Sequence, residues 1–157
     1  MGEASENIRV RVAVWLELAA SDHHDAGLVV LRQNGRPFWV LPGGTLEYGE
    51  TLEACARREL MEELGLKIEV VRLLSVSEFI QNGRHVLDVV VQGRWLHGQL
   101  PSQPPFEENI DAVTTVSPET HGGYEIQPKA VIEPLLRQWG QHQLESWVAG
   151  YIAHTPS

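Results

Sequence analysis

Three glutamates in the stretch Gly43–Leu66 stand at a spacing that suits a divalent cation. Glu59, Glu62 and Glu63 occupy positions i, i+3 and i+4, and on an α-helix this spacing places all three carboxylates on one face. Three like charges so close together repel and raise one another's pKa. A hard divalent cation relieves that repulsion, and Mg²⁺ prefers oxygen ligands together with substrate phosphates. The spacing therefore indicates either a metal site for phosphate chemistry or a solvated acidic helix face.

The residues around these glutamates predict a glycine loop that leads into a helix. Gly43 and Gly44 allow the backbone to turn and to approach a ligand closely. Thr51 is a suitable N-cap for a helix over Thr51–Leu64, which has good helix formers and contains neither Pro nor Gly. Gly65 suits the position just past the helix end. An apolar stripe at four-residue spacing is expected to face the core: Leu52, Ala56, Leu60 and Leu64.

The joint pattern of glycine, acid and arginine positions resembles the Nudix box, the signature of the Nudix hydrolases. The pattern is G-x5-E-x7-R-E-U-x-E-E-x-G-U, with U an apolar residue, and these residues fill it: Gly44, Glu50, Arg58, Glu59, Leu60, Glu62, Glu63, Gly65 and Leu66. A match of this length favours a functional site over a solvated face. The resemblance implies an α+β domain with the Nudix fold, a mixed β-sheet packed between α-helices.

The activity implied by the resemblance is hydrolysis of a pyrophosphate bond in a nucleoside diphosphate linked to another moiety. The implied cofactor is Mg²⁺, with Mn²⁺ as an alternative. Glu59 and Glu63 would be the primary metal ligands. Glu62 would be a third ligand or would hold a second metal through water. The carbonyl of Gly43 would complete the coordination shell.

The resemblance also implies which groups take part in the catalytic step: Glu59, Glu62, Arg58 and Glu108. Arg58 would either contact a substrate phosphate, or orient Glu59 and pair with Glu50 as a supporting residue. The general base would be a glutamate of the box or an acid from a later loop, because members of the family differ in this respect. In this chain the later loop offers three acids, of which Glu108 is favoured: Glu107, Glu108 and Asp111. A charged loop without a catalytic role is the alternative.

Four residues are candidates for contact with the substrate: Gly44, Arg36, Trp39 and Arg84. The two arginines lie at turns from which they could reach phosphates. Trp39 either packs in the core or lies near a nucleobase. The stretch Ile80–His85 has neither the proline nor the tyrosine that, in the family, accompanies ADP-ribose or dinucleoside polyphosphate hydrolysis. A nucleoside triphosphate and a nucleotide sugar therefore both stay open as substrates.

Two other functions are compatible with the same fold. The first is a non-catalytic Nudix-fold module that binds or senses a nucleotide, and the unbroken set of glutamates argues against it. The second is an isoprenoid diphosphate isomerase, which would rearrange its substrate without releasing phosphate. A screen of substrates in the presence of Mg²⁺ separates the three hypotheses.

Composition limits the class of protein and its partners. At 157 residues the chain is expected to form one domain over residues 1–157, with residues 1–8 as a flexible tail. The net charge of −9 argues against long nucleic acid as a partner. No apolar run approaches the ~18 residues of a membrane span. The single cysteine, Cys55, and the polar N-terminal residues favour the cytoplasm. Five tryptophans suggest a homodimer.

Periodicity and turn residues predict the remaining elements. Asn34–Gly35 and Asn82–Gly83 are expected hairpin turns, and Gly93 is expected to mark a β-bulge. Helices are expected over Pro128–Trp139 and Leu144–Ile152. The expected strands are Arg9–Leu18, Gly27–Gln33, Pro37–Leu41, Lys67–Leu74, Val76–Ile80, His85–Leu96 and Ala112–Val116.

Overall fold

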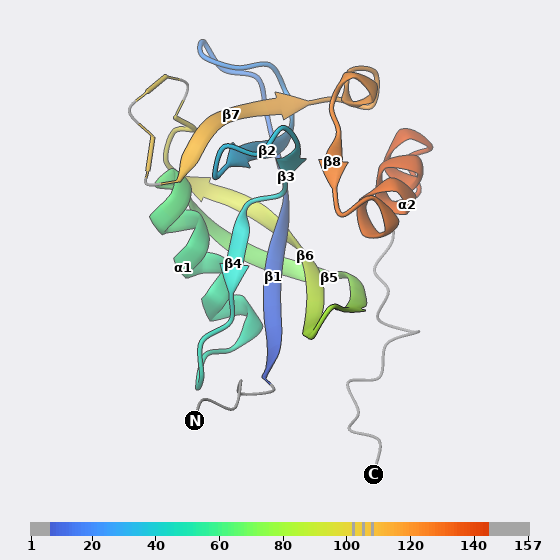
Figure 1. The fold of residues 1–157 in the computed structure, drawn as a ribbon. Coiled ribbons are helices and arrows are strands. Elements are labelled where there is room, and N and C mark those ends of the chain that lie inside the picture. The colour runs from blue at the N-terminus through green and yellow to red at the C-terminus, as the bar shows by residue number, and fades with distance from the viewer. Residues whose placement is uncertain (1–6, 102, 105, 108, 145–157) are drawn as a thin grey trace.

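The computed structural model describes residues 7–101, 103–104, 106–107 and 109–144, which form a mixed sheet with helices on its two sides (Figure 1). The strands are β1 (Ile8–Leu18), β2 (Gly27–Gln33), β3 (Trp39–Val40), β4 (Gly43–Thr45), β5 (Lys67–Gln81), β6 (Arg84–His97), β7 (Ile110–Val116) and β8 (Ile126–Gln127). The helices are α1 (Leu52–Leu64), the short 3-10 helix η1 (His121–Gly123) and α2 (Lys129–Gly140). The predicted α+β architecture is confirmed.

Strand β1 is the centre of the sheet, whose strand order is β5-β6-β1-β2-β3-β8. It runs parallel to β6 along one edge, from the pair Ile8↔His85 to the pair Leu16↔Gly93. Along its other edge β1 pairs first with β4 and then with β2, both antiparallel. Strand β7 pairs with β2. The short strand β4 therefore brings the glycine pair of the sequence motif against the middle of the sheet.

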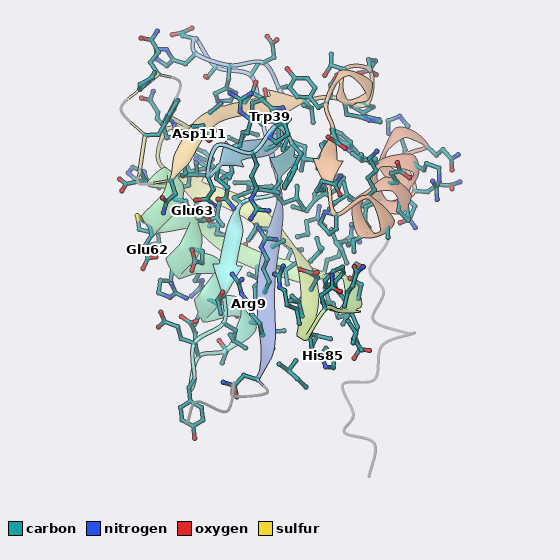
Figure 2. All side chains as sticks on the ribbon, viewed as in Figure 1. Arg9, Trp39, Glu62, Glu63, His85 and Asp111 are labelled. Carbon is teal, nitrogen blue, oxygen red and sulfur yellow. The ribbon has the colours of Figure 1, made fainter. Side chains whose placement is uncertain are left out.

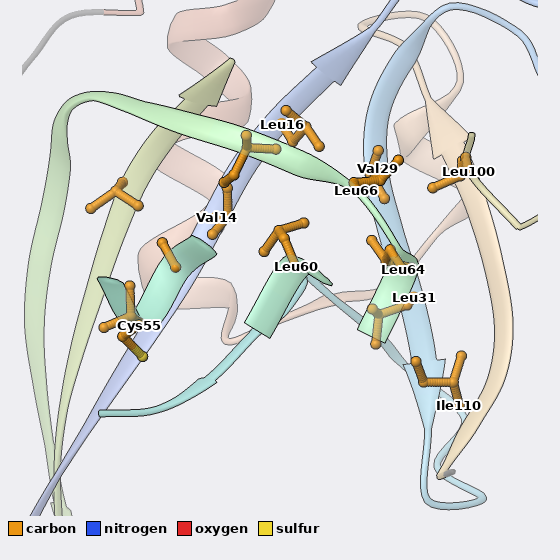
Figure 3. Close-up of a cluster of buried hydrophobic side chains, with 14 of the residues drawn as sticks. Val14, Leu16, Val29, Leu31, Cys55, Leu60, Leu64, Leu66, Leu100 and Ile110 are labelled. Carbon is orange, nitrogen blue, oxygen red and sulfur yellow. The ribbon is translucent and has the colours of Figure 1, made fainter. Parts of the chain in front are cut away.

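The alternation along β1 divides the core into two clusters. Val12, Val14 and Leu16 face α1, and Figure 3 shows Leu60 and Leu64 of α1 among them and their neighbours. The residues of opposite parity, Ala13 and Trp15, pack in a second cluster with α2. Because successive side chains of a strand point to opposite faces, one strand supports both helices. No helix among the described residues is long and apolar enough to cross a bilayer.

The predicted ends of α1 are confirmed. Thr51 is the N-cap, and its hydroxyl accepts a hydrogen bond from the N–H of Ala54 at 3.0 Å. Gly65 ends the helix at φ 66°, a left-handed conformation in which its N–H bonds back to the last turn. The apolar stripe differs by one position, because Cys55 is buried and Leu52 is only half-buried.

The hairpin after α1 differs from the sequence prediction. The two strands expected over Lys67–Leu74 and Val76–Ile80 form one continuous strand, β5, whose pairing with β6 shifts register at three places. One of these shifts lies at Gly93, where a β-bulge was expected, but the extra residue, Val71, is on β5 and not on β6. A Cβ at Gly93 would lie 2.9 Å from Val14 Cγ1, so close packing between strand and core accounts for this glycine.

Three further boundaries differ from expectation. The strand expected over Pro37–Leu41 shortens to β3. Ile8, which we expected in the tail, pairs with His85 in the sheet, while residues 1–6 lie outside the described residues. The helix expected over Leu144–Ile152 falls outside the described residues from position 145 onward.

Candidate functional site

Two carboxylates of α1 lie against the glycine pair of β4. Glu63 Oε1 accepts a hydrogen bond from the N–H of Gly43 at 2.8 Å. The Glu59 carboxylate lies directly beside Gly44, since a Cβ built on Gly44 would come within 2.3 Å of Glu59 Cδ. Glu62 points away from the protein, with 59% of its side chain exposed (Figure 2). The helix thus offers two sheltered carboxylates beside β4 and a third at the solvent.

The close approach of β4 to β1 requires glycine at position 43. Gly43 adopts φ 150°, and a Cβ there would lie 2.0 Å from the carbonyl oxygen of Val12. The contact that the structure shows for Gly43 is through its N–H, whereas the sequence prediction gave it a role through its carbonyl. The absence of side chains at 43 and 44 is what allows α1 to bring its carboxylates so close to the sheet.

Burial sets the charge of Glu63. The pKa of Glu63 is raised to about 7, chiefly by removal from solvent and also by the charge of Glu59, while the hydrogen bond from Gly43 and the charge of Arg11 oppose the rise. A raised pKa of this kind means that, without a bound cation, the surroundings of Glu63 do not fully offset the cost of burying its negative charge. A cation held beside this carboxylate would offset the remainder of that cost.

Arg58 joins the acids of the box into one network. Its Nε and Nη2 donate to the two oxygens of Glu50 at 2.7 and 3.0 Å. Its Nη1 donates to Glu59 Oε1 at 2.8 Å and to Glu62 Oε2 at 3.3 Å, and Nη2 also reaches the carbonyl of Thr45 at 3.2 Å. All three guanidinium nitrogens therefore have protein partners, which favours the positioning role over contact with phosphate.

Glu50 is held as a carboxylate by this network. The hydrogen bonds from Arg58, and then the N–H of Glu47 at 3.0 Å, lower the pKa of Glu50 to about 2. The same contacts raise the pKa of Arg58 above its usual value. Glu50 thus anchors the loop between β4 and α1 to the guanidinium that orients Glu59.

Arg11 is a site residue that the sequence analysis missed. It projects from β1 and donates from Nη2 to the carbonyl of Leu41 at 3.1 Å. Burial lowers its pKa, and the charges of Asp88 and Glu63 oppose that change. The available signal was an arginine in the strand that pairs with the glycine loop. Without knowledge of this pairing, the alternation of the strand placed Arg11 on its solvent-facing side.

Of the four predicted substrate contacts, Gly44 lies against Glu59, and the contacts observed for Arg36, Trp39 and Arg84 do not involve the Arg58 network. The guanidinium carbon of Arg32 lies 5.3 Å from the centre of the Trp39 ring, and Tyr124 meets the same ring edge-on at 5.4 Å. Arg36 is exposed and lies over the ring of Phe38. Arg84 is exposed at the start of β6. Their roles toward a substrate stay predictions.

The acids proposed for the general base can be placed only in part. Glu108 lies outside the described residues. Asp111 is described, and its Oδ2 accepts a hydrogen bond from the N–H of Gly35 at 2.7 Å, which ties the start of β7 to the turn after β2 (Figure 2). Glu107 is exposed. The identity of the base therefore stays a prediction.

The donor set fits a hard cation. Among the described residues no three His, Cys, Asp or Glu side chains converge in a ready-made metal geometry. Mg²⁺ does not need such a cage, because it keeps several waters and takes one or two carboxylates together with substrate phosphates. Glu59 and Glu63, side by side at β4, supply hard oxygen ligands of this kind.

A cavity of about 680 Å³ lies elsewhere, between η1 and α2. Its walls include Tyr124, Glu133 and Arg137. None of the box glutamates lines it. This cavity is therefore separate from the candidate site at β4.

Cys55 is expected to be inert in the folded protein. Burial raises the pKa of its thiol to about 12, so almost none is thiolate at pH 8. We expect an Ellman assay at pH 8 to give no reaction in native buffer and one thiol per chain in denaturant. A fast reaction in native buffer would contradict the burial of Cys55 on the core side of α1.

Comparison with known proteins agrees with this geometry. The NUDIX domain family model matches residues 8–136. An RNA pyrophosphohydrolase of Pseudoalteromonas atlantica is 31% identical over 98 residues, 56% of this chain and 55% of that protein. An 8-oxo-dGDP phosphatase of Mus musculus is 51% identical over 43 residues, 27% of this chain and 13% of that protein. The chain thus spans about half the length of the RNA pyrophosphohydrolases that it matches, 55% and 47% in two cases.

A solved structure shows that the fold is shared along nearly the whole chain. The crystal structure of a MutT protein from Methanosarcina mazei superposes with a TM-score of 0.67 at 19% identity. The match covers 91% of this chain and 100% of that one. The expected sheet between helices is therefore the same architecture as in that protein.

Proposed function

Because the chain belongs to the Nudix family, we propose that it is a Mg²⁺-dependent pyrophosphohydrolase acting on a nucleoside diphosphate linked to another group. This proposal is supported chiefly by the placement of Glu59 and Glu63 at the β4 glycines, together with the hydrogen bond that Arg58 donates to Glu59. This arrangement places two carboxylates in fixed positions beside a glycine backbone, where a cation bound to them would meet the phosphates of a substrate.

The residues of the site have two proposed roles, metal binding and positioning of the metal ligands. Glu59 and Glu63 would bind the cation, and Glu62, at the solvent side, would complete its surroundings. Arg58 orients Glu59 through the hydrogen bond at 2.8 Å, and Glu50 fixes Arg58 in turn. A bound divalent cation would neutralise phosphate oxygens and activate water for attack. Since phosphoryl transfer depends on positioning and charge stabilisation, a rigid network of this kind suits the reaction.

A mononucleotide derivative is the substrate we favour. Two relatives carry names that refer to RNA and to 8-oxo-dGDP; 8-oxo-dGDP contains a phosphoanhydride next to its nucleoside, and an RNA contains one only at a 5′ end that carries a di- or triphosphate. The net charge of −9 disfavours a long polyanion. We therefore expect small nucleotides to be cleaved faster than the 5′ end of an RNA.

The test is a substrate panel. Nucleoside di- and triphosphates, nucleotide sugars, dinucleotides and a 5′-triphosphorylated RNA oligonucleotide are incubated with Mg²⁺ or Mn²⁺, and phosphate is read after phosphatase coupling. Hydrolysis that EDTA abolishes supports the proposal. Tight nucleotide binding without hydrolysis across the panel would instead favour a sensor module.

Substitution of Gly44 is expected to impair the site without unfolding the protein. In Gly44→Ala the new Cβ would collide with the Glu59 carboxylate, which Arg58 holds in place. A displacement of about 1 Å can reduce kcat/KM roughly 100-fold, and we expect a loss of at least about tenfold in steady-state assays. Gly122→Ala, with open space around its Cβ, should keep wild-type activity. Equal activity of the two variants would contradict the packing of Glu59 on Gly44.

A further inference from the structure

Two rows of paired residues form a partly exposed face of the sheet on the side where α2 packs. Residues paired directly across strands point to the same face, and the rows run from β1 through β6 to β5. They are Arg9, Val86 and Phe79 in one row, and Arg11, Asp88 and Ser77 in the other. The next row belongs to the core under α2, since Ala13 and Val90 are buried there. The face formed by the two rows therefore adjoins the part of the sheet that α2 covers.

The charges on this face are ordered across the strands. Arg11 lies between the acids of α1 and Asp88 of β6, and the charges of Glu63 and Asp88 both act on it. Arg9 is exposed next to it, and its Nε donates to Thr45 Oγ1 of β4 at 2.8 Å. These two contacts leave other N–H groups of both arginines for an anion, and guanidinium groups bind phosphate in a bidentate manner.

The far end of the face combines a carboxylate with an aromatic ring. Asp88 is only half-buried, and an ionised carboxylate offers hydrogen-bond acceptors alone. Phe79, in the adjoining row on β5, is 43% exposed, which is high for a large apolar side chain. Stacking on an aromatic ring is a common way to hold a base, because every base has a flat apolar face.

We propose that these two rows are the floor of the nucleotide-binding site, with Arg9 and Arg11 contacting phosphates and Asp88 accepting hydrogen bonds from a base that stacks on Phe79. The proposal rests on the proposed function for the identity of the ligand as a nucleotide. In this arrangement the substrate extends across the sheet. Its scissile phosphates lie at the glutamates of α1, a further phosphate lies at the two arginines of β1, and the base lies over β6 and β5. Guanine, with adjacent N–H donors on one edge, fits a carboxylate best.

The test measures binding without catalysis. The dissociation constant of GTP is determined by calorimetry in EDTA for wild type, Asp88→Asn and Arg9→Gln. We expect Asp88→Asn to weaken GTP binding about tenfold, because an amide cannot accept both donors of guanine, and to change UTP binding much less. Arg9→Gln should weaken GTP binding several-fold and leave GMP nearly unchanged.

Matched controls separate these effects from loss of charge or fold. Glu78→Gln removes a carboxylate next to Asp88 in the pairing but on the opposite face of the sheet, and Arg57→Gln removes an exposed cation from α1. Both should bind GTP like wild type. Unchanged GTP affinity in Asp88→Asn and Arg9→Gln, or no GTP binding by wild type in EDTA, would overturn the proposal. Failure of the proposed function would appear separately, as binding in EDTA with no hydrolysis in Mg²⁺.

Discussion

Glu63→Gln is expected to abolish hydrolysis while it leaves the protein folded. The substitution removes one of the two sheltered carboxylates at β4, and we expect kcat/KM to fall by at least about 1,000-fold, because metal-assisted charge stabilisation contributes several kcal/mol to such a reaction. The glutamine oxygen can still accept the N–H of Gly43, which Glu63 accepts at 2.8 Å. The assay is steady-state kinetics on a substrate that wild type cleaves.

The thermal stability of the same variant gives an independent check of the geometry. Burial raises the pKa of Glu63 from 4.5 to about 7, so the folded wild-type protein binds more protons than the unfolded chain between these values. Its stability without metal therefore falls as the pH rises through this window. Glu63→Gln lacks this loss and should melt at a higher temperature than wild type at pH 8 in EDTA, with little difference at pH 4.

Glu53→Gln provides the control for both measurements. Glu53 lies on the same helix, half-exposed, and pairs only with the exposed Arg57 among the ion pairs observed. We expect wild-type activity and a melting temperature within about 1 °C, because exposed pairs of this kind contribute little. A Glu63→Gln enzyme that retains the wild-type rate would refute the assignment of Glu63 to the metal.

Local chemistry explains which parts of the site the sequence could predict. The ends of α1 depend on Thr51 and Gly65, whose hydrogen bonds are made within a few residues. The glutamate spacing depends only on helical periodicity. The predicted helix ends were confirmed because the residues that determine them are neighbours in the chain, and α1 brings Glu59 and Glu63 to β4 while Glu62 lies at the solvent.

Long-range pairing explains what the sequence could not predict. Arg11 meets Asp88 only because β1 runs parallel to β6 in one particular register, and no local pattern specifies that register. Gly93 was interpreted as a bulge because glycine in a strand often marks one. The structure places the extra residue on β5, opposite Gly93, and Gly93 itself is required for close contact with Val14, a partner distant in sequence. The continuity of β5 likewise depends on its pairing with β6, which continues across the register shifts between the two strands.

Arg58→Ala is expected to reduce both activity and stability, because Arg58 is the shared partner of the acidic residues in the box. Its removal would leave Glu50 without its bidentate partner and Glu59 without the bond at 2.8 Å. We expect kcat/KM to fall about 10- to 100-fold, in line with the loss of residues that orient metal ligands. The pair with Glu50 is largely shielded, with 24% and 13% of the two side chains exposed. Loss of this pair should therefore lower the melting temperature by several degrees.

The pH dependence of stability identifies the network as the cause. Arg58 holds the pKa of Glu50 at about 2 instead of 4.5, so this pair stabilises wild type above pH 4.5 and the stabilisation is lost as the pH falls toward 2. In Arg58→Ala that part of the acid dependence should disappear. Arg58→Lys should restore some stability but little activity, since an ammonium cannot make the bidentate contact. Arg57→Ala, at the neighbouring exposed position, should behave like wild type in both assays. If Arg57→Ala and Arg58→Ala were equally mild, the loop between β4 and α1 would have to be held by contacts other than this guanidinium.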